Sequence, residues 1–179
     1  MAHEAVIVSG VRSAIGDFGG ALAGVPPTVL AADMAREAIR RAGIAADAVE
    51  LTVFGNVIHT EPKDMYLSRV AAIGAGVPET APALTLNRLC GSGLQAVVSA
   101  AEAVLLGNAE VALAGGAESM SRSGYLDTAA RFGQKMGDVA VTDMMVGALN
   151  DPFGHGHMGI TAENVADRFG LGREEQDEF

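Results

Sequence analysis

The chain has one cysteine in 179 residues, Cys90, and its surroundings favour a reactive thiol. It stands in the run Asn-Arg-Leu-Cys-Gly-Ser-Gly-Leu-Gln-Ala (87–96), between an extended apolar stretch and a long apolar helix pattern. Backbone N–H groups at a helix start lack intrahelical partners and carry partial positive charge, so a thiolate is stabilised there. The chemistry of such a group is nucleophilic attack. Free cysteine is also among the most buried residue types, so this placement alone leaves an inert buried thiol equally open.

The same run allows a second chemistry, the binding of a dinucleotide. Gly91-Ser-Gly93-Leu-Gln-Ala96 matches the pattern G-x-G-x-x-A between a strand and a helix, and Glu118 follows the next predicted strand at about the expected distance. This alternative would make the chain an oxidoreductase module that binds a nicotinamide or flavin nucleotide. Against it, the pattern usually follows the first strand of its domain, whereas two strand and helix units precede it here.

Other polar residues give weaker signals. Ser92 is a poor candidate nucleophile because Gly91 and Gly93 do not complete the pattern G-x-S-x-G, and its small size for helix packing is the simpler account. His59 and His155 lack companions at metal-ligand spacing, so no metal site is predicted. His3 lies beside the terminus and is expected to be exposed.

Composition excludes several classes of function. A formal net charge of −10 and a pI near 4.7 argue against binding to nucleic acid or to an anionic membrane. No window of about 18 apolar residues occurs, so no membrane span is predicted. One cysteine forms no internal disulfide, and the first residues lack the pattern of a secretory leader, so a cytoplasmic location is expected. The hydrophobic content of 49% excludes disorder.

Apolar periodicity predicts strands that alternate with helices, which is the pattern of an α/β layered fold. The predicted strands are Glu4–Ser9, Leu51–Val57, Ala83–Asn87 and Glu110–Gly116. Helices are predicted from Thr28 as N-cap to a stop at Gly43, from about Met65 to Ile73, from Gly91 to Leu106, from Thr161 as N-cap to Phe169 with Glu163 in the first turn, and from Arg173 onward.

The helix that follows Cys90 is apolar on nearly all sides. Its only polar side chains are Ser92, Gln95, Ser99 and Glu102, so it requires cover on almost every face and a layer beyond the usual three. That layer is expected to come from outside this chain. From 118 to 158 the pattern breaks into short pieces rich in glycine and methionine, which indicates an excursion from the core. The last predicted helix also has no stop signal, so an incomplete folding unit is expected.

Five motifs, in order along the chain, together resemble the amino-terminal half of a thiolase. They are Val11-Arg-Ser-Ala-Ile-Gly16, Phe54-Gly-Asn-Val57, Asn87-Arg-Leu-Cys-Gly-Ser-Gly-Leu-Gln-Ala96, Gly115-Gly-Ala-Glu-Ser-Met-Ser121 and His157-Met-Gly-Ile-Thr-Ala-Glu-Asn164. The residues of these motifs are most similar to those of acetyl-CoA acetyltransferases and β-ketothiolases. The resemblance implies a layered αβαβα architecture of two stacked α/β halves. Residues 1–117 would form the amino-terminal core, and 118–179 would begin an inserted loop region for coenzyme A binding and oligomerisation.

The resemblance also implies a chemistry. Cys90 would accept an acyl group from acyl-CoA as a thioester, and the enzyme would condense two acetyl-CoA molecules to acetoacetyl-CoA or cleave a 3-ketoacyl-CoA with coenzyme A. His157 and Met158 would line the pantetheine end of the substrate. Coenzyme A or acyl-CoA would be a substrate, with no permanently bound cofactor.

The remaining partners follow from the same resemblance. An activating histidine and a second cysteine would belong to the carboxy-terminal half, supplied by the same enzyme or by a complementary chain. The assembly would be a homodimer or homotetramer, and 179 residues alone would be inactive. Because the apolar helix 91–106 would lie exposed, they would also be poorly soluble unless a complementary chain supplies the cover. A further alternative is a natural split product that acts as a structural subunit.

Overall fold

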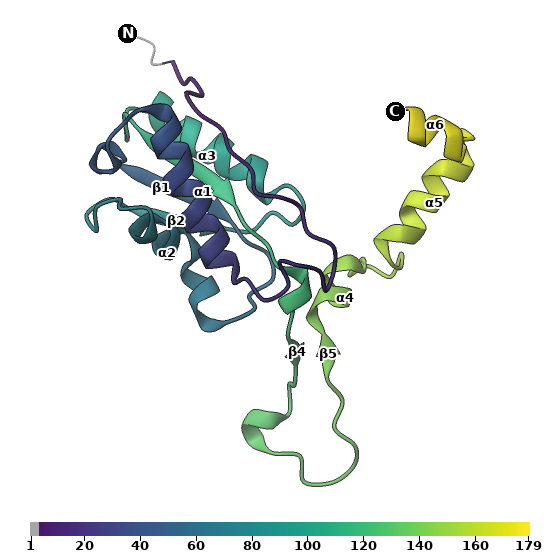
Figure 1. Cartoon of the computed structure of the whole chain (residues 1–179). Coiled ribbons are helices and arrows are strands. Elements are labelled where there is room, and N and C mark those ends of the chain that lie inside the picture. Colours follow the sequence, from purple (N-terminus) through teal and green to yellow (C-terminus); the bar gives the residue numbers. More distant parts are fainter. Residues whose placement is uncertain (1–3) are drawn as a thin grey trace. The chain divides into compact units, whose positions relative to one another are not determined.

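The structure is a computed structural model that describes residues 4–179, so the expectation for His3 lies outside the described residues. Two compact units make up the chain, Met1–Ser123 and Gly124–Phe179. The first unit contains a parallel sheet with helices on both of its faces (Figure 1). This arrangement confirms the predicted α/β class.

The sheet has three parallel strands in the order β2-β1-β3. These are β1 (Leu51–Gly55), β2 (Ala83–Leu86) and β3 (Ala112–Gly116), so three of the four predicted strands are confirmed with shorter bounds. Central β1 is buried almost throughout, because helices cover both faces of the sheet. Its neighbouring residues Val53 and Phe54 consequently belong to two different core clusters.

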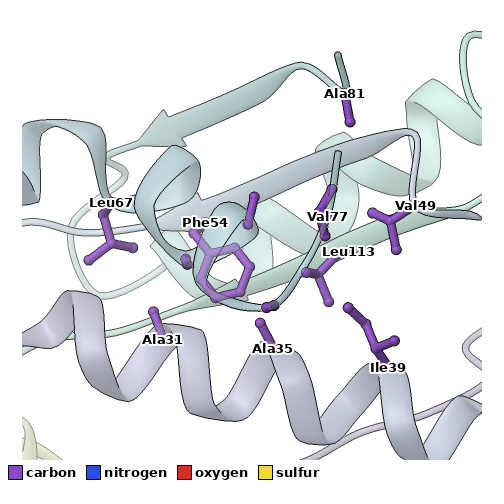
Figure 2. Close-up of a cluster of buried hydrophobic side chains, with 12 residues drawn as sticks. Ala31, Ala35, Ile39, Val49, Phe54, Leu67, Val77, Ala81 and Leu113 are labelled. Carbon is purple, nitrogen blue, oxygen red and sulfur yellow. The ribbon is translucent and has the colours of Figure 1, made fainter. Parts of the chain in front are cut away.

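Helices α1 (Pro27–Ala42) and α2 (Leu67–Gly74) pack together on the Phe54 face. The apolar stripe of α1 supplies Ala31, Ala35 and Ile39, which point from one side of the helix toward Phe54 and Leu113 (Figure 2). On the opposite face, α3 (Ser92–Leu105) buries Ala96 and Ala100 against Val53. Alanine at these positions allows the helix backbone to approach the sheet closely.

The predicted N-cap of α1 is wrong. The helix begins at Pro27, with Pro26 as N-cap, and Thr28 lies inside the first turn as a buried residue. Proline suits this first position because its fixed φ matches the helix and its missing N–H would be unpaired there anyway. The predicted stop is confirmed, since Gly43 adopts the left-handed conformation with φ 69°.

The strand predicted over Glu4–Ser9 is also wrong, since these residues form no regular secondary structure. Val6, Ile7 and Val8 are 69%, 81% and 69% exposed. Their apolar pattern encodes burial, but a strand also requires a hydrogen-bonding neighbour. The described residues of the chain supply neither the neighbour nor the cover.

The all-apolar helix α3 keeps an uncovered side in this chain, as its composition predicts. Ala96 is fully buried, whereas Leu94 is 72% exposed and Val98 is 39% exposed. The described residues therefore cover only the face that packs on the sheet.

The second unit consists of short elements. Strands β4 (Tyr125–Leu126) and β5 (Thr142–Asp143) form an antiparallel pair, followed by α4 (Met144–Leu149), α5 (Met158–Phe169) and α6 (Arg173–Glu178). The residues from 4 to 179 also include four 3-10 turns, η1 (Ala46–Ala48), η2 (Pro62–Tyr66), η3 (Met120–Arg122) and η4 (Ala130–Phe132). Among residues 4–179, no helix has the length and hydropathy needed to cross a membrane.

The predicted start of α5 is wrong by several residues. The helix begins at Met158, so Thr161 does not cap it and Glu163 lies beyond its first turn. The cap is His157, whose ring nitrogen Nδ1 accepts a hydrogen bond from the Gly159 N–H at 2.9 Å. Sequence reasoning missed it because histidine is not among the preferred N-cap residues.

Candidate active site

Cys90 lies at the edge of the sheet where the parallel strands end. Three residues separate it from Leu86, the last residue of β2, and the first residue of α3 follows two positions later. The thiol is exposed. The carboxyl ends of parallel strands are the usual location of ligand sites in open α/β sheets, so the fold presents Cys90 where chemistry is expected.

A tight turn carries Cys90. The Gly91 N–H donates to the Arg88 carbonyl at 3.1 Å, and the Ser92 N–H donates to the Leu89 carbonyl at 3.0 Å. The sequence pattern predicts unpaired N–H groups at this helix start. Two of them, those of Gly91 and Ser92, instead form hydrogen bonds within the turn. The Leu89 N–H in turn donates to the Asn87 side-chain oxygen at 2.8 Å.

Leu89 is strained. Its φ of 47° makes it the one non-glycine residue with positive φ in the described part of the chain. A left-handed backbone costs a residue with a Cβ about 1–2 kcal/mol. Such strain persists only where the surroundings impose it, and it clusters at functional sites. The residue immediately before the candidate nucleophile therefore carries a conformational constraint.

Two glycines let α3 approach the strand ends. A Cβ on Gly55 would lie 2.7 Å from the Ser92 Cβ and 2.8 Å from its carbonyl carbon. A Cβ on the neighbouring Gly116 would lie 3.1 Å from the Gly55 oxygen and 3.6 Å from the Gly93 Cα. The glycines at the ends of β1 and β3 are visible in the sequence and could have indicated this close approach. Sequence reasoning missed their role in positioning the Cys90 turn.

Glu118 joins the ends of β1 and β3. Its carboxylate accepts hydrogen bonds from the Val57 N–H at 2.8 Å and the Ile58 N–H at 3.0 Å. Asn56, which is 1% exposed, donates to it at 3.1 Å and to the Ala117 carbonyl at 3.0 Å. Glu118, which the dinucleotide alternative takes as the acidic residue after the next strand, therefore already accepts hydrogen bonds from the protein's own backbone.

Burial raises the pKa of Glu118 above its ordinary value of 4.5, even though part of the side chain stays exposed. Hydrogen bonds from the Val57 and Ile58 N–H groups oppose this shift, and the negative charge of Asp64 adds to it. The raised pKa means that the folded protein holds a proton on Glu118 more tightly than the unfolded chain does.

This shift predicts a pH dependence. A raised carboxyl pKa contributes stability that is fully present below 4.5 and is lost as pH rises through the folded-state pKa. Glu118→Gln in the full-length protein removes this titration. The stability difference between wild type and Glu118→Gln should therefore shift against wild type as pH rises, which urea unfolding at several pH values measures. A difference that moves in favour of wild type with rising pH would contradict the assigned shift.

A second network holds the loop that follows β1. Arg122 donates to the Glu61 carboxylate at 2.9 Å and to the Thr60 hydroxyl at 3.4 Å. Asp64, which has no exposed surface, accepts from the Thr60 N–H and hydroxyl at 2.6 and 2.8 Å. The Arg122 contacts join residues about 60 positions apart, so no local sequence pattern reveals them.

His157 and Met158 lie in the second unit, at the start of α5. Both are exposed. Because the His157 Nδ1 accepts the Gly159 N–H, the neutral ring carries its proton on Nε2. His157 therefore presents a free N–H donor, and Met158 presents an apolar neighbour that is 41% exposed.

The structure brings together no metal-binding set. Within residues 4–179, no group of three or more His, Cys, Asp or Glu side chains lies close enough to hold a metal ion. His59 and His155 belong to different units, Met1–Ser123 and Gly124–Phe179 respectively.

Comparison with known proteins places this chain in a family. A family model described as the N-terminal domain of thiolase matches residues 5–179. The chain is 61% identical over 178 residues to the beta-ketothiolase BktB of Cupriavidus necator, covering 99% of this chain and 45% of that protein. It is 45% identical over 177 residues to an acetyl-CoA acetyltransferase of the same organism, covering 98% of this chain and 45% of that protein.

Solved structures give the same answer. The acetyl-CoA acetyltransferase of Bacillus anthracis superposes with a TM-score of 0.90 at 41% identity, covering 98% of this chain and 44% of that chain. Human mitochondrial 3-ketoacyl-CoA thiolase in complex with CoA superposes with a TM-score of 0.89 at 36% identity, covering 96% and 44%. The chain spans somewhat less than half the length of the relatives it matches.

Proposed function

The chain belongs to the thiolase family, and from that premise we propose that the full-length protein transfers acyl groups between coenzyme A thioesters through Cys90. The observation that carries this proposal is the exposed Cys90 on a constrained turn at the carboxyl edge of a parallel sheet. The enzymatic names of the relatives, a beta-ketothiolase and acetyl-CoA acetyltransferases, support the reaction class.

The reaction proceeds in two exchanges. The Cys90 thiolate attacks the thioester carbonyl of an acyl-CoA, the new S–C bond forms, and the coenzyme A thiolate leaves and takes up a proton. In synthesis, the α-carbon of a second acetyl-CoA loses a proton and attacks the acyl carbon, which gives acetoacetyl-CoA and frees Cys90. In degradation, the same steps run backward, so a 3-ketoacyl-CoA and coenzyme A give two acyl-CoA molecules.

Stabilisation of the oxyanion is shared between this chain and the rest of the enzyme. The Cys90 N–H supplies one donor to the tetrahedral intermediate. The thiolase resemblance assigns the activating histidine, the second cysteine and a further oxyanion site to the carboxy-terminal half. Residues 1–179 alone are accordingly proposed to be inactive.

His157 and Met158 are proposed to contact the pantetheine arm of the substrate. The free Nε2–H of His157 suits a carbonyl acceptor, and the Met158 side chain suits an apolar contact. We further propose that 118–179 begins the loop region that binds coenzyme A and joins subunits in a dimer or tetramer. Coenzyme A enters as substrate and no cofactor stays bound, and a cytoplasmic location fits such metabolites.

A turnover assay of the full-length protein tests this function. Acetoacetyl-CoA and coenzyme A should be converted to acetyl-CoA, separated and counted by chromatography. Tight NADH binding without such turnover would instead favour the dinucleotide alternative. That alternative has no support in the comparisons, and its loop follows β2, an edge strand of the described sheet.

A further inference from the structure

The hydroxyl of Ser92 bridges the turn that carries Cys90. It accepts a hydrogen bond from the Arg88 N–H at 2.8 Å and donates one to the Leu89 carbonyl at 2.6 Å. Ser92 is 5% exposed, so water does not compete strongly for these bonds. One buried hydroxyl therefore holds two peptide groups that flank Leu89, the one that carries the Arg88 N–H and the one that joins Leu89 to the candidate nucleophile.

The conformation held by these bonds is the strained one. Leu89 has a φ of 47°, which leucine does not adopt without support. The Ser92 hydroxyl holds the Leu89 carbonyl and the Arg88 N–H, while the Asn87 side chain holds the Leu89 N–H. Without the hydroxyl, the turn loses a buried partner on each side of the strained residue.

Close contact with Gly55, the last residue of β1, fixes the position of Ser92. Its Cβ and carbonyl carbon occupy the space that a Cβ on Gly55 would need, at 2.7 and 2.8 Å. Close packing of α3 on β1 accounts for a small side chain at 92, but alanine would serve that purpose equally. The two hydrogen bonds are the feature that packing alone leaves unexplained.

We propose that Ser92 is a positioning residue for acyl transfer, because its hydroxyl sets the backbone that aims the Cys90 Sγ and N–H. This proposal rests on the proposed function of Cys90. Ser92 itself forms no bond to substrate and does not exchange a proton with it. It acts through the Arg88–Cys90 backbone.

A matched pair of variants in the full-length protein tests the proposal. Ser68 is another buried serine whose hydroxyl accepts from a backbone N–H, that of Phe54 at 2.8 Å, and donates to the Leu84 carbonyl at 2.6 Å, with the Phe54 carbonyl more distant at 3.5 Å. Ser92→Ala and Ser68→Ala thus remove equivalent hydrogen bonds, but only Ser92 touches the Cys90 turn. The measurements are thermal unfolding, KM, and the single-turnover rate of acetyl transfer from acetyl-CoA to Cys90.

Both variants should unfold at a lower temperature than wild type. Only Ser92→Ala should also slow acetyl transfer, by about 10- to 100-fold, because small misplacements of reacting groups have effects of that size. Its KM should change little. A Ser92→Ala rate equal to wild type, or an equal slowing in Ser68→Ala, would overturn the positioning role. A wild-type protein that forms no adduct on Cys90 would instead overturn the proposed function itself.

Discussion

Cys90→Ser in the full-length protein should reduce thiolytic and synthetic turnover by about 1,000-fold or more. Serine keeps the size of the side chain, but its hydroxyl stays protonated at neutral pH and is a far weaker nucleophile than a thiolate. Cys90 is exposed, so the substitution leaves the core intact. Steady-state assays with acetoacetyl-CoA and coenzyme A measure the loss.

The control for this variant is its folded state. Thermal unfolding of Cys90→Ser should match wild type, since exposed substitutions usually change stability by about 0.5 kcal/mol or less. Binding of coenzyme A should also persist. A Cys90→Ser enzyme with most of its turnover intact would show that another group accepts the acyl chain.

Gly55→Ala should damage both stability and catalysis. The added Cβ would meet the Ser92 Cβ at 2.7 Å and the Ser92 carbonyl carbon at 2.8 Å, and part of that obstacle is helix backbone. Relieving the overlap requires α3 to move away from β1, which should cost about 1–3 kcal/mol of unfolding free energy. The same shift displaces the Cys90 turn, so acyl transfer should fall by about 100-fold.

Gly24→Ala is the matched control, because a Cβ at Gly24 has no atom of the described structure within 4 Å and its φ lies outside the left-handed range. Urea unfolding and single-turnover acylation should leave Gly24→Ala close to wild type. If Gly55→Ala acylates as fast as Gly24→Ala, the close contact between β1 and α3 does not position Cys90.

The sequence predicts those features that depend on local pattern. The apolar stripe of α1 and the alternation of strands and helices identify the α/β core, and Gly43 marks the end of the first helix. The motif around Cys90 identifies the candidate nucleophile. Each of these signals lies within a few residues, where helix periodicity and glycine conformations act directly.

Features that depend on distant contacts could not be predicted in the same way. The sequence gives Ser92 a packing role but does not identify the distant residue Gly55 as its contact. Glu118 fits the acidic position of the dinucleotide pattern until the Val57 and Ile58 amides are seen on its carboxylate. The segment Val6–Val8 shows the opposite error, because the sequence predicts a strand that the structure does not form. Its apolar residues predict a strand, but pairing depends on neighbours that the described residues do not provide.

Mass spectrometry of the full-length protein, quenched soon after mixing with acetyl-CoA, tests the central claim most directly. The proposed mechanism predicts one acetyl group on the peptide that contains Cys90, and its loss when coenzyme A is added back. An unmodified Cys90 together with an acetyl group on another residue would contradict the assignment of Cys90 as the acyl carrier.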